Sequence, residues 1–156
     1  MWKIGICTDF KDHGKMTRLK EMGFDFFEFG FSSIGNADPA DVDAAVEKVK
    51  ELGIPVASMN GLIPAELKMT GPDADHDKVA AFVEKTLKRA VRFGTRNYVL
   101  GSGGARRVPE GFSQEEATRQ LQSLFSEQLV PIFAKYDCIL SIEELRKEEC
   151  NIFNSI

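Results

Sequence analysis

The chain has 156 residues, of which 43% are hydrophobic and 28% are charged, a composition typical of one soluble globular domain. Its formal net charge of -4 argues against a general affinity for nucleic acid phosphates, which need a basic protein surface. No stretch approaches the ~20 apolar residues of a membrane span, and the N-terminus lacks the apolar core of a signal peptide. We therefore expect a single cytoplasmic domain over residues 1–156 that binds neither nucleic acid nor membrane.

The chain opens with two predicted strands and a short helix between them. The strands are expected at residues 3–8 and 24–30, and the helix at residues 16–22. With a period of two, Glu28 shares one face of the second strand with Phe26 and Gly30. Because a carboxylate among phenylalanines needs a partner, Glu28 either makes a structural hydrogen bond inside a barrel mouth or binds substrate.

The middle of the chain continues the alternation of helix and strand. We expect a helix over 39–52, a strand over 54–59, a helix whose apolar side runs over 79–91, and a strand over 97–100. Asp38 is the predicted N-cap of the first of these helices, with Pro39 at its first position. Asn60, which follows the third strand, either binds a sugar hydroxyl or forms an ordinary Asn-Gly turn.

A glycine-rich segment, residues 101–104, follows the fourth strand. We expect it to be a flexible loop; the alternative is a phosphate site that also uses Arg106 and Arg107. Ser113 and Glu116 then have the spacing of a capping box, which predicts a helix that continues to about residue 133.

One short pattern recurs at three helix ends: Met22-Gly23-Phe24, Leu52-Gly53-Ile54 and Phe93-Gly94-Thr95, each followed by an apolar run. Regular alternation of helices and strands with short turns favours consecutive right-handed βαβ units and a parallel sheet. A nucleotide-binding Rossmann sheet needs a glycine-rich turn after its first strand, and here no glycine follows until Gly14. We therefore predict an α/β fold, a parallel (β/α) barrel of TIM type truncated to about its first five βα units.

The fifth strand carries the most informative carboxylate. Residues 138–142 are mainly apolar, and Glu143 and Glu144 follow at once. Strand ends are the working positions of such barrels, so Glu143 is the first candidate for chemistry. Glu149 follows six positions later, where a loop can return it to the same edge, although residues 143–149 could also be a solvated helical face. We expect the fifth strand itself to be buried on both faces.

At this strand the sequence resembles the xylose isomerase-like TIM barrel superfamily, closest to ketose 3-epimerases of the tagatose and psicose epimerase type. The segment IEELRKEE followed by NIFNSI is similar to the family's fifth strand, and GFDFFEFG, NGLIP and LGSGG are similar to the ends of its second, third and fourth strands. The resemblance implies that Glu143 binds a divalent metal (Mn, Mg, Co or Zn) and acts as a base. It implies that Glu149, Glu28, Asn60 and Arg146 bind the sugar.

The sequence also departs from this family. By resemblance, the other metal ligands and the second catalytic glutamate belong to strands six to eight, which these residues do not include. We therefore expect either a fragment of a metal-dependent sugar isomerase or epimerase that retains little metal, or an inactive half-barrel that self-associates through its open sheet edges. The zinc-dependent apurinic endonucleases share the fold, but Asn60 and Ser102 stand where they need histidines.

The three cysteines, Cys7, Cys138 and Cys150, have no metal-site spacing and indicate reduced thiols. Cys7 and Cys138 lie in apolar, strand-like runs, so we expect both to be buried as small hydrophobic side chains.

Overall fold

A five-stranded parallel sheet forms the centre of the protein, which we describe over residues 2–154 of a computed structural model. The strands are β1 (Gly5–Cys7), β2 (Phe26–Gly30), β3 (Val56–Asn60), β4 (Asn97–Leu100) and β5 (Ile139–Ile142). They lie in the order β1-β2-β3-β4-β5, so each strand pairs with the next one in the chain. This order is that of consecutive βα units in a barrel, and it confirms the predicted fold class.

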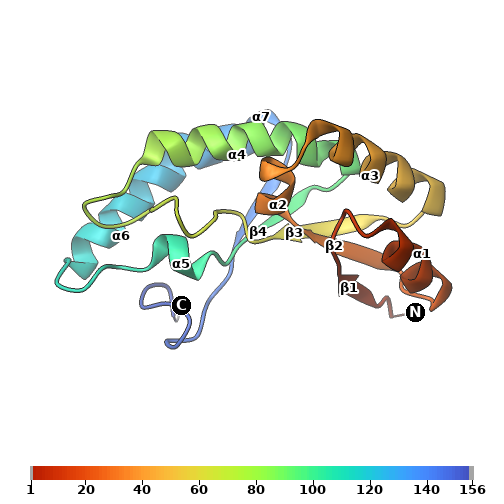
Figure 1. Cartoon of the computed structure of the whole chain (residues 1–156). Coiled ribbons are helices and arrows are strands. Elements are labelled where there is room, and N and C mark those ends of the chain that lie inside the picture. The colour runs from red at the N-terminus through yellow and green to blue at the C-terminus, as the bar shows by residue number, and fades with distance from the viewer. Residues whose placement is uncertain (1, 155–156) are drawn as a thin grey trace.

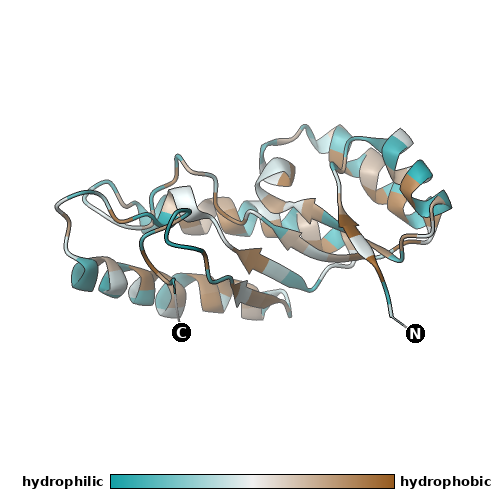
Figure 2. Cartoon of the chain, turned by 90° about the horizontal axis from the view of Figure 1, so that it is seen from below, coloured by the Kyte–Doolittle hydropathy of each residue, from teal (hydrophilic) through white to brown (hydrophobic). Residues whose placement is uncertain are grey.

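Helices connect the strands. They are α1 (His13–Glu21), α2 (Phe31–Asn36), α3 (Pro39–Leu52), α4 (His76–Ala90), α5 (Gly103–Arg106), α6 (Gln114–Ser123) and α7 (Val130–Lys135). The long helices α3 and α4 lie along one side of the sheet, and the C-terminal segment lies on the other (Figure 1). Figure 2 looks at the chain from below, where the strands carry both hydrophobic and hydrophilic residues.

The helix-covered side of the sheet contains the aromatic core. Phe27 and Phe29 are fully buried and stack with their ring centroids 5.9 Å apart, and Phe29 meets Phe93 edge-on at 5.5 Å. Tyr98 on β4 is also fully buried and meets Phe31 at 5.4 Å. Because side chains alternate along a strand, burying these rings turns Glu28 and Val99 to the opposite, inner face.

The sequence signals at helix ends are confirmed. Asp38 accepts a hydrogen bond from the Ala40 N–H at 2.8 Å, and Pro39 begins α3. The three recurring glycines, Gly23, Gly53 and Gly94, have φ angles of +90°, +61° and +79°. Only glycine adopts this left-handed conformation at little cost, so each one ends its helix and turns the chain toward the next strand.

The expected long helix near the C-terminus is interrupted in its middle. Between α6 and α7, residues Leu124–Leu129 form a π-helix. Pro131 follows within the first turn of α7. Proline has no N–H to donate to the carbonyl four residues earlier, and a widened turn accommodates the missing bond.

The prediction that β5 is buried on both faces is wrong. Ile139 is 62% exposed and Ile142 is 49% exposed. The reason is topological, since β5 is the last strand of the sheet and pairs only with β4 within the described residues.

No helix of residues 2–154 has the length and apolar character needed to cross a membrane.

Candidate functional site

Glu28 lies at the centre of a polar cluster on the inner face of the sheet. The strand register places Cys7 of β1 beside Glu28, and Glu28 beside Ser58 of β3. The Cys7 thiol donates to Oε1 of Glu28 at 3.0 Å, and the Asn60 amide Nδ2 donates to the same oxygen at 2.7 Å. The Ser58 hydroxyl donates to Oε2 of Glu28. Three donors from two neighbouring strands therefore converge on one carboxylate.

These contacts keep Glu28 ionised. Partial burial acts to raise the pKa of Glu28, but the hydrogen bonds from Cys7, Ser58 and Asn60 outweigh it, and the net pKa is lower than usual. The hydrogen bond to this carboxylate, helped by burial, raises the pKa of Cys7 to about 11. At neutral pH the cluster is thus a carboxylate that accepts from a neutral thiol, a hydroxyl and an amide.

Glu143 directly follows β5 at the carboxyl edge of the sheet. Its N–H donates to the Leu100 carbonyl at 3.1 Å, and its own carbonyl accepts from Nη2 of Arg106 at 2.7 Å. Its carboxylate lies over Gly101, where any side chain would collide with Oε2. Within residues 2–154 the carboxylate takes part in no hydrogen bond or ion pair. The backbone of Glu143 is therefore fixed, and its carboxylate is available.

Arg106 supplies part of that fixation from inside the protein. It is fully buried, and Nη1 also reaches the Leu100 carbonyl at 3.4 Å. The guanidinium carbon lies 5.7 Å from the centre of the Phe153 ring. Within residues 2–154, Arg106 forms no ion pair and its Nε has no hydrogen-bond partner. Arg106 thus joins the ends of β4 and β5 through main-chain carbonyls.

The expected flexible loop at residues 101–104 is wrong in its second half. Gly103–Arg106 form the short helix α5. Arg107, which follows it, donates to the Glu149 carbonyl at 2.7 Å. Because both arginines donate to main-chain carbonyls, the structure does not support the alternative of a phosphate site that uses their guanidinium groups.

The segment after Glu143 folds back without forming a helix. Arg146 and Glu149 form an ion pair with each other at 3.1 Å, and both side chains are exposed. Asn154 holds the segment closed, since its Nδ2 donates to the carbonyls of Leu145 and Cys150, each at 2.7 Å. Glu149 is therefore paired with Arg146 and is not part of the Glu28 cluster.

Two members of the inner-face cluster were missed by sequence reasoning. Cys7 is exposed on the inner face, so its predicted burial is wrong; Cys138 is partly buried, less than expected. Ser58 is not among the predicted site residues. The signal for both was the strand register, because Cys7 and Ser58 are the direct neighbours of Glu28 on β1 and β3. Pairing between strands far apart in the sequence is not visible in one strand's own pattern.

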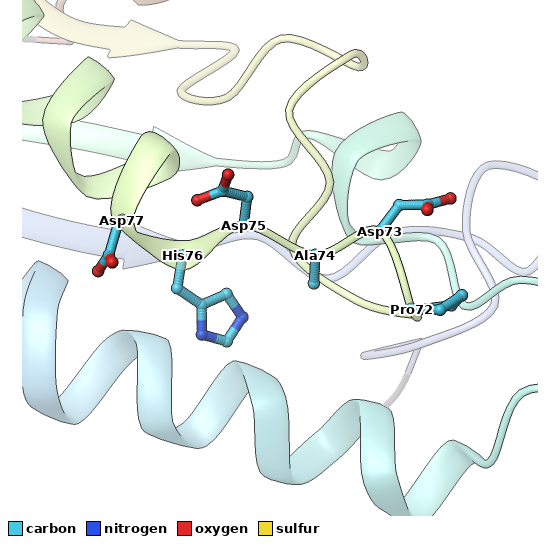
Figure 3. Close-up of a pocket in the computed structure, with 6 residues that line it drawn as sticks. All are labelled: Pro72, Asp73, Ala74, Asp75, His76 and Asp77. Atoms are coloured by element: carbon cyan, nitrogen blue, oxygen red, sulfur yellow. The ribbon is translucent and has the colours of Figure 1, made fainter.

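A second group of acidic residues lies at the start of α4. Figure 3 shows the pocket lined by residues 72–77, with Asp73, Asp75, Asp77 and His76 pointing in different directions. Asp75 accepts from the Lys78 N–H at 3.0 Å and pairs with its ammonium at 2.8 Å, while His76 contacts the Met69 carbonyl at 3.1 Å. Asp75 is therefore the N-cap of α4. Residues 2–154 contain no group of three or more His, Cys, Asp or Glu side chains able to hold a metal ion.

Comparisons with known proteins agree with the fold. The model of the family described as "Xylose isomerase-like TIM barrel" matches residues 16–156. Similar solved structures include 3-keto-D-glucoside 4-epimerase, YcjR, from E. coli, with 19% identity and a TM-score of 0.70 over 92% of this chain and 57% of that one. D-psicose 3-epimerase from Clostridium cellulolyticum H10, solved with D-tagatose, has 15% identity and a TM-score of 0.82 over 99% of this chain and 56% of that one.

An L-ribulose 3-epimerase has 16% identity and a TM-score of 0.71, over 94% of this chain and 51% of that one. At these identities the likeness establishes a common fold. The chain spans just over half the length of each of these structures. No curated protein matches the sequence.

Proposed function

The chain belongs to the xylose isomerase-like TIM barrel family, and we propose that it is part of a metal-dependent sugar isomerase or epimerase acting on a ketose or related polyol. The observation that carries this proposal is the state of Glu143. Its main chain is held on both sides by Leu100 and Arg106, and its carboxylate has no bonding partner within residues 2–154. A fixed, unpaired carboxylate at a strand end suits a catalytic base.

Epimerisation next to a ketone begins with removal of a carbon-bound proton. In this proposal Glu143 takes that proton, the electron pair passes into an enediolate, and an acid on the opposite face returns a proton to the same carbon. The family resemblance assigns the acid to a glutamate of an eighth strand. Asn60, Glu149 and Arg146 would contact sugar hydroxyls, and Glu28 would support this group through its contact with the Asn60 amide.

A divalent metal would stabilise the enediolate as a Lewis acid. The Glu143 carboxylate offers the hard oxygen ligand that such ions prefer. One carboxylate does not fix an ion, and residues 2–154 supply no complete ligand set around it. The metal therefore depends on an Asp, a His and a Glu beyond β5, as the resemblance implies.

The test is exchange of the substrate carbon-bound proton for deuterium. D-tagatose in deuterated buffer with Mn²⁺ is incubated with this chain alone. It is then incubated with this chain and a polypeptide carrying the last βα units of the C. cellulolyticum H10 enzyme. We expect no exchange by the chain alone and Mn²⁺-dependent exchange by the pair. Glu143→Gln should abolish that exchange, and the neighbouring Glu144→Gln should retain it.

Two outcomes would contradict the proposal. Metal-dependent turnover by the chain alone would show that the ligand count is wrong. A soluble, folded complex of the two polypeptides without exchange would remove the assignment of Glu143.

A second candidate is a catalytically inactive half-barrel that self-associates. The specific observation in its favour is β5, the last strand of the sheet within residues 2–154, whose Ile139 and Ile142 are exposed. Light scattering on the isolated chain tests it, with Ile139→Lys as the disrupting variant and the exposed, helical Val130→Lys as the control. A monomer at all concentrations would rule this candidate out.

A further inference from the structure

The polar cluster around Glu28 determines which way the Asn60 amide faces. We propose that Glu28 is a positioning residue that holds Nδ2 of Asn60 and so presents Oδ1 of Asn60 to the open inner face, as an acceptor for a substrate hydroxyl. The hydroxyl as ligand rests on the function proposed above. The orientation of the amide rests on the contacts alone.

The direction of the hydrogen bonds follows from chemistry. An ionised carboxylate only accepts, so the Asn60 atom at 2.7 Å from Oε1 of Glu28 must be the amide nitrogen. The lowered pKa of Glu28 keeps it in this acceptor form at neutral pH. The same nitrogen also lies 3.8 Å from the Cys7 sulfur. Within residues 2–154, Oδ1 of Asn60 receives no hydrogen bond, and Asn60 is partly exposed.

Glu28 has little capacity left to bind a sugar itself. The Cys7 thiol and the Ser58 hydroxyl donate to its two oxygens in addition to Asn60. Because the pKa of Cys7 is about 11, the thiol remains a donor throughout the neutral range. Three of the roughly four acceptor positions of the Glu28 carboxylate are thus occupied, whereas Oδ1 of Asn60 receives no hydrogen bond within residues 2–154.

The position of Asn60 fits a site shared with Glu143. Asn60 ends β3 level with Ser141 of β5, and Glu143 lies two residues further on, so their main chains are two strand spacings (~10 Å) apart across the sheet and ~7 Å apart along it. Gly101, which follows β4 between them, has no side chain, and the Glu143 carboxylate occupies the space that one would fill. A small polyol can therefore bridge the carboxylate on one side and the Asn60 oxygen on the other.

The orientation can be measured directly by NMR on the ¹⁵N-labelled full chain. The Asn60 side-chain amide signals are assigned by their loss in Asn60→Ser. We expect them to shift with pH as Glu28 is protonated below its ordinary pKa, and we expect this step to disappear in Glu28→Gln. Cys7, the other titratable group in the cluster, does not titrate in this range.

Two controls accompany this experiment. The Asn154 amide, which donates to two carbonyls, should show no such step. Glu110→Gln, which removes an exposed carboxylate elsewhere, should leave the Asn60 step intact. Asn60 signals that do not respond to pH, or that keep the step in Glu28→Gln, would overturn the proposed orientation.

Addition of D-tagatose to the same sample tests the hydroxyl subsite. We expect the ketose to shift the Asn60 amide, and to bind Glu28→Gln at least about five-fold more weakly, as the loss of one oriented hydrogen bond predicts. A ketose that shifts signals around Glu143 and leaves Asn60 unmoved would overturn the subsite. If no ketose binds even after the complementary βα units and Mn²⁺ are added, the hydroxyl subsite and the proposed function both fail, whereas the pH step still decides the orientation of Asn60.

Discussion

Replacing Arg106 by alanine should destabilise the protein more than any change at its exposed neighbour Arg107. Arg106→Ala removes the bond to the Glu143 carbonyl, worth ~1.5–3 kcal/mol because the donor is charged. It also removes the contact with Phe153, worth ~1–2 kcal/mol, and leaves a cavity that costs ~2–5 kcal/mol. Alanine, however, carries no charge, so the variant avoids the cost of burying an unpaired guanidinium group, and this offsets several kcal/mol of the loss. The expected net loss in the free energy of unfolding is ~3 kcal/mol.

Urea denaturation followed by circular dichroism measures this change, with Arg107→Ala as the matched control. Arg107 is exposed and also donates to a main-chain carbonyl, so the pair separates burial from hydrogen bonding. The Glu143 amide signal should move in Arg106→Ala and stay in place in Arg107→Ala. An Arg106→Ala variant as stable as the control, with an unmoved Glu143 signal, would refute the role of Arg106 at the strand ends.

Three further predictions concern the two carboxylates. Gly101→Ala should displace the Glu143 carboxylate. Because the end of that side chain is flexible, the free energy of unfolding should stay within ~1 kcal/mol of wild type, while proton exchange in the reconstituted enzyme should be abolished. Retained exchange would contradict the position of the carboxylate over Gly101. Glu28 has a lowered folded pKa, so its contribution to stability is present above its unfolded pKa of ~4.3 and is lost as pH falls through the folded value. Urea midpoints should therefore fall in acid more steeply for wild type than for Glu28→Gln, and parallel curves would disprove the coupling. The isolated chain should bind Mn²⁺ with a dissociation constant of ~1 mM or weaker, because Glu143 is a single ligand. Electron paramagnetic resonance during a Mn²⁺ titration measures this constant. Micromolar binding would mean that the chain supplies a set of several ligands.

Much of the fold was available from the sequence because its signals are local. Asp38 with Pro39 began α3 where a capping residue and a fixed φ favour a helix, and Gly53 ended it in the left-handed conformation. The alternation of helix and strand then indicated a parallel barrel, since short turns and right-handed crossovers leave few other topologies. The position of Glu143 at a strand end followed from the same pattern.

The partners of each candidate side chain came only from the tertiary structure. Glu28 and Cys7 are 21 residues apart in the chain, and the register of β1 on β2 alone brings them into contact. The burial of Arg106 was equally invisible, because a charged residue in a glycine-rich segment suggests solvent. Its place inside the protein depends on the carbonyls of Leu100 and Glu143 at two different strand ends.

The sequence by itself therefore determined the strands, the long helices, their order and the chemical groups at the strand ends, since capping, turn conformation and side-chain alternation act over a few residues; it did not predict the short helices α2 and α5 or the π-helix. The tertiary structure decided which of those groups are paired and which remain available. Glu28 accepts from three donors, Glu149 is paired with Arg146, and the Glu143 carboxylate has no bond within residues 2–154 although its main chain is held. That distinction depends on strand register and on burial, which are set by contacts between residues far apart in the chain.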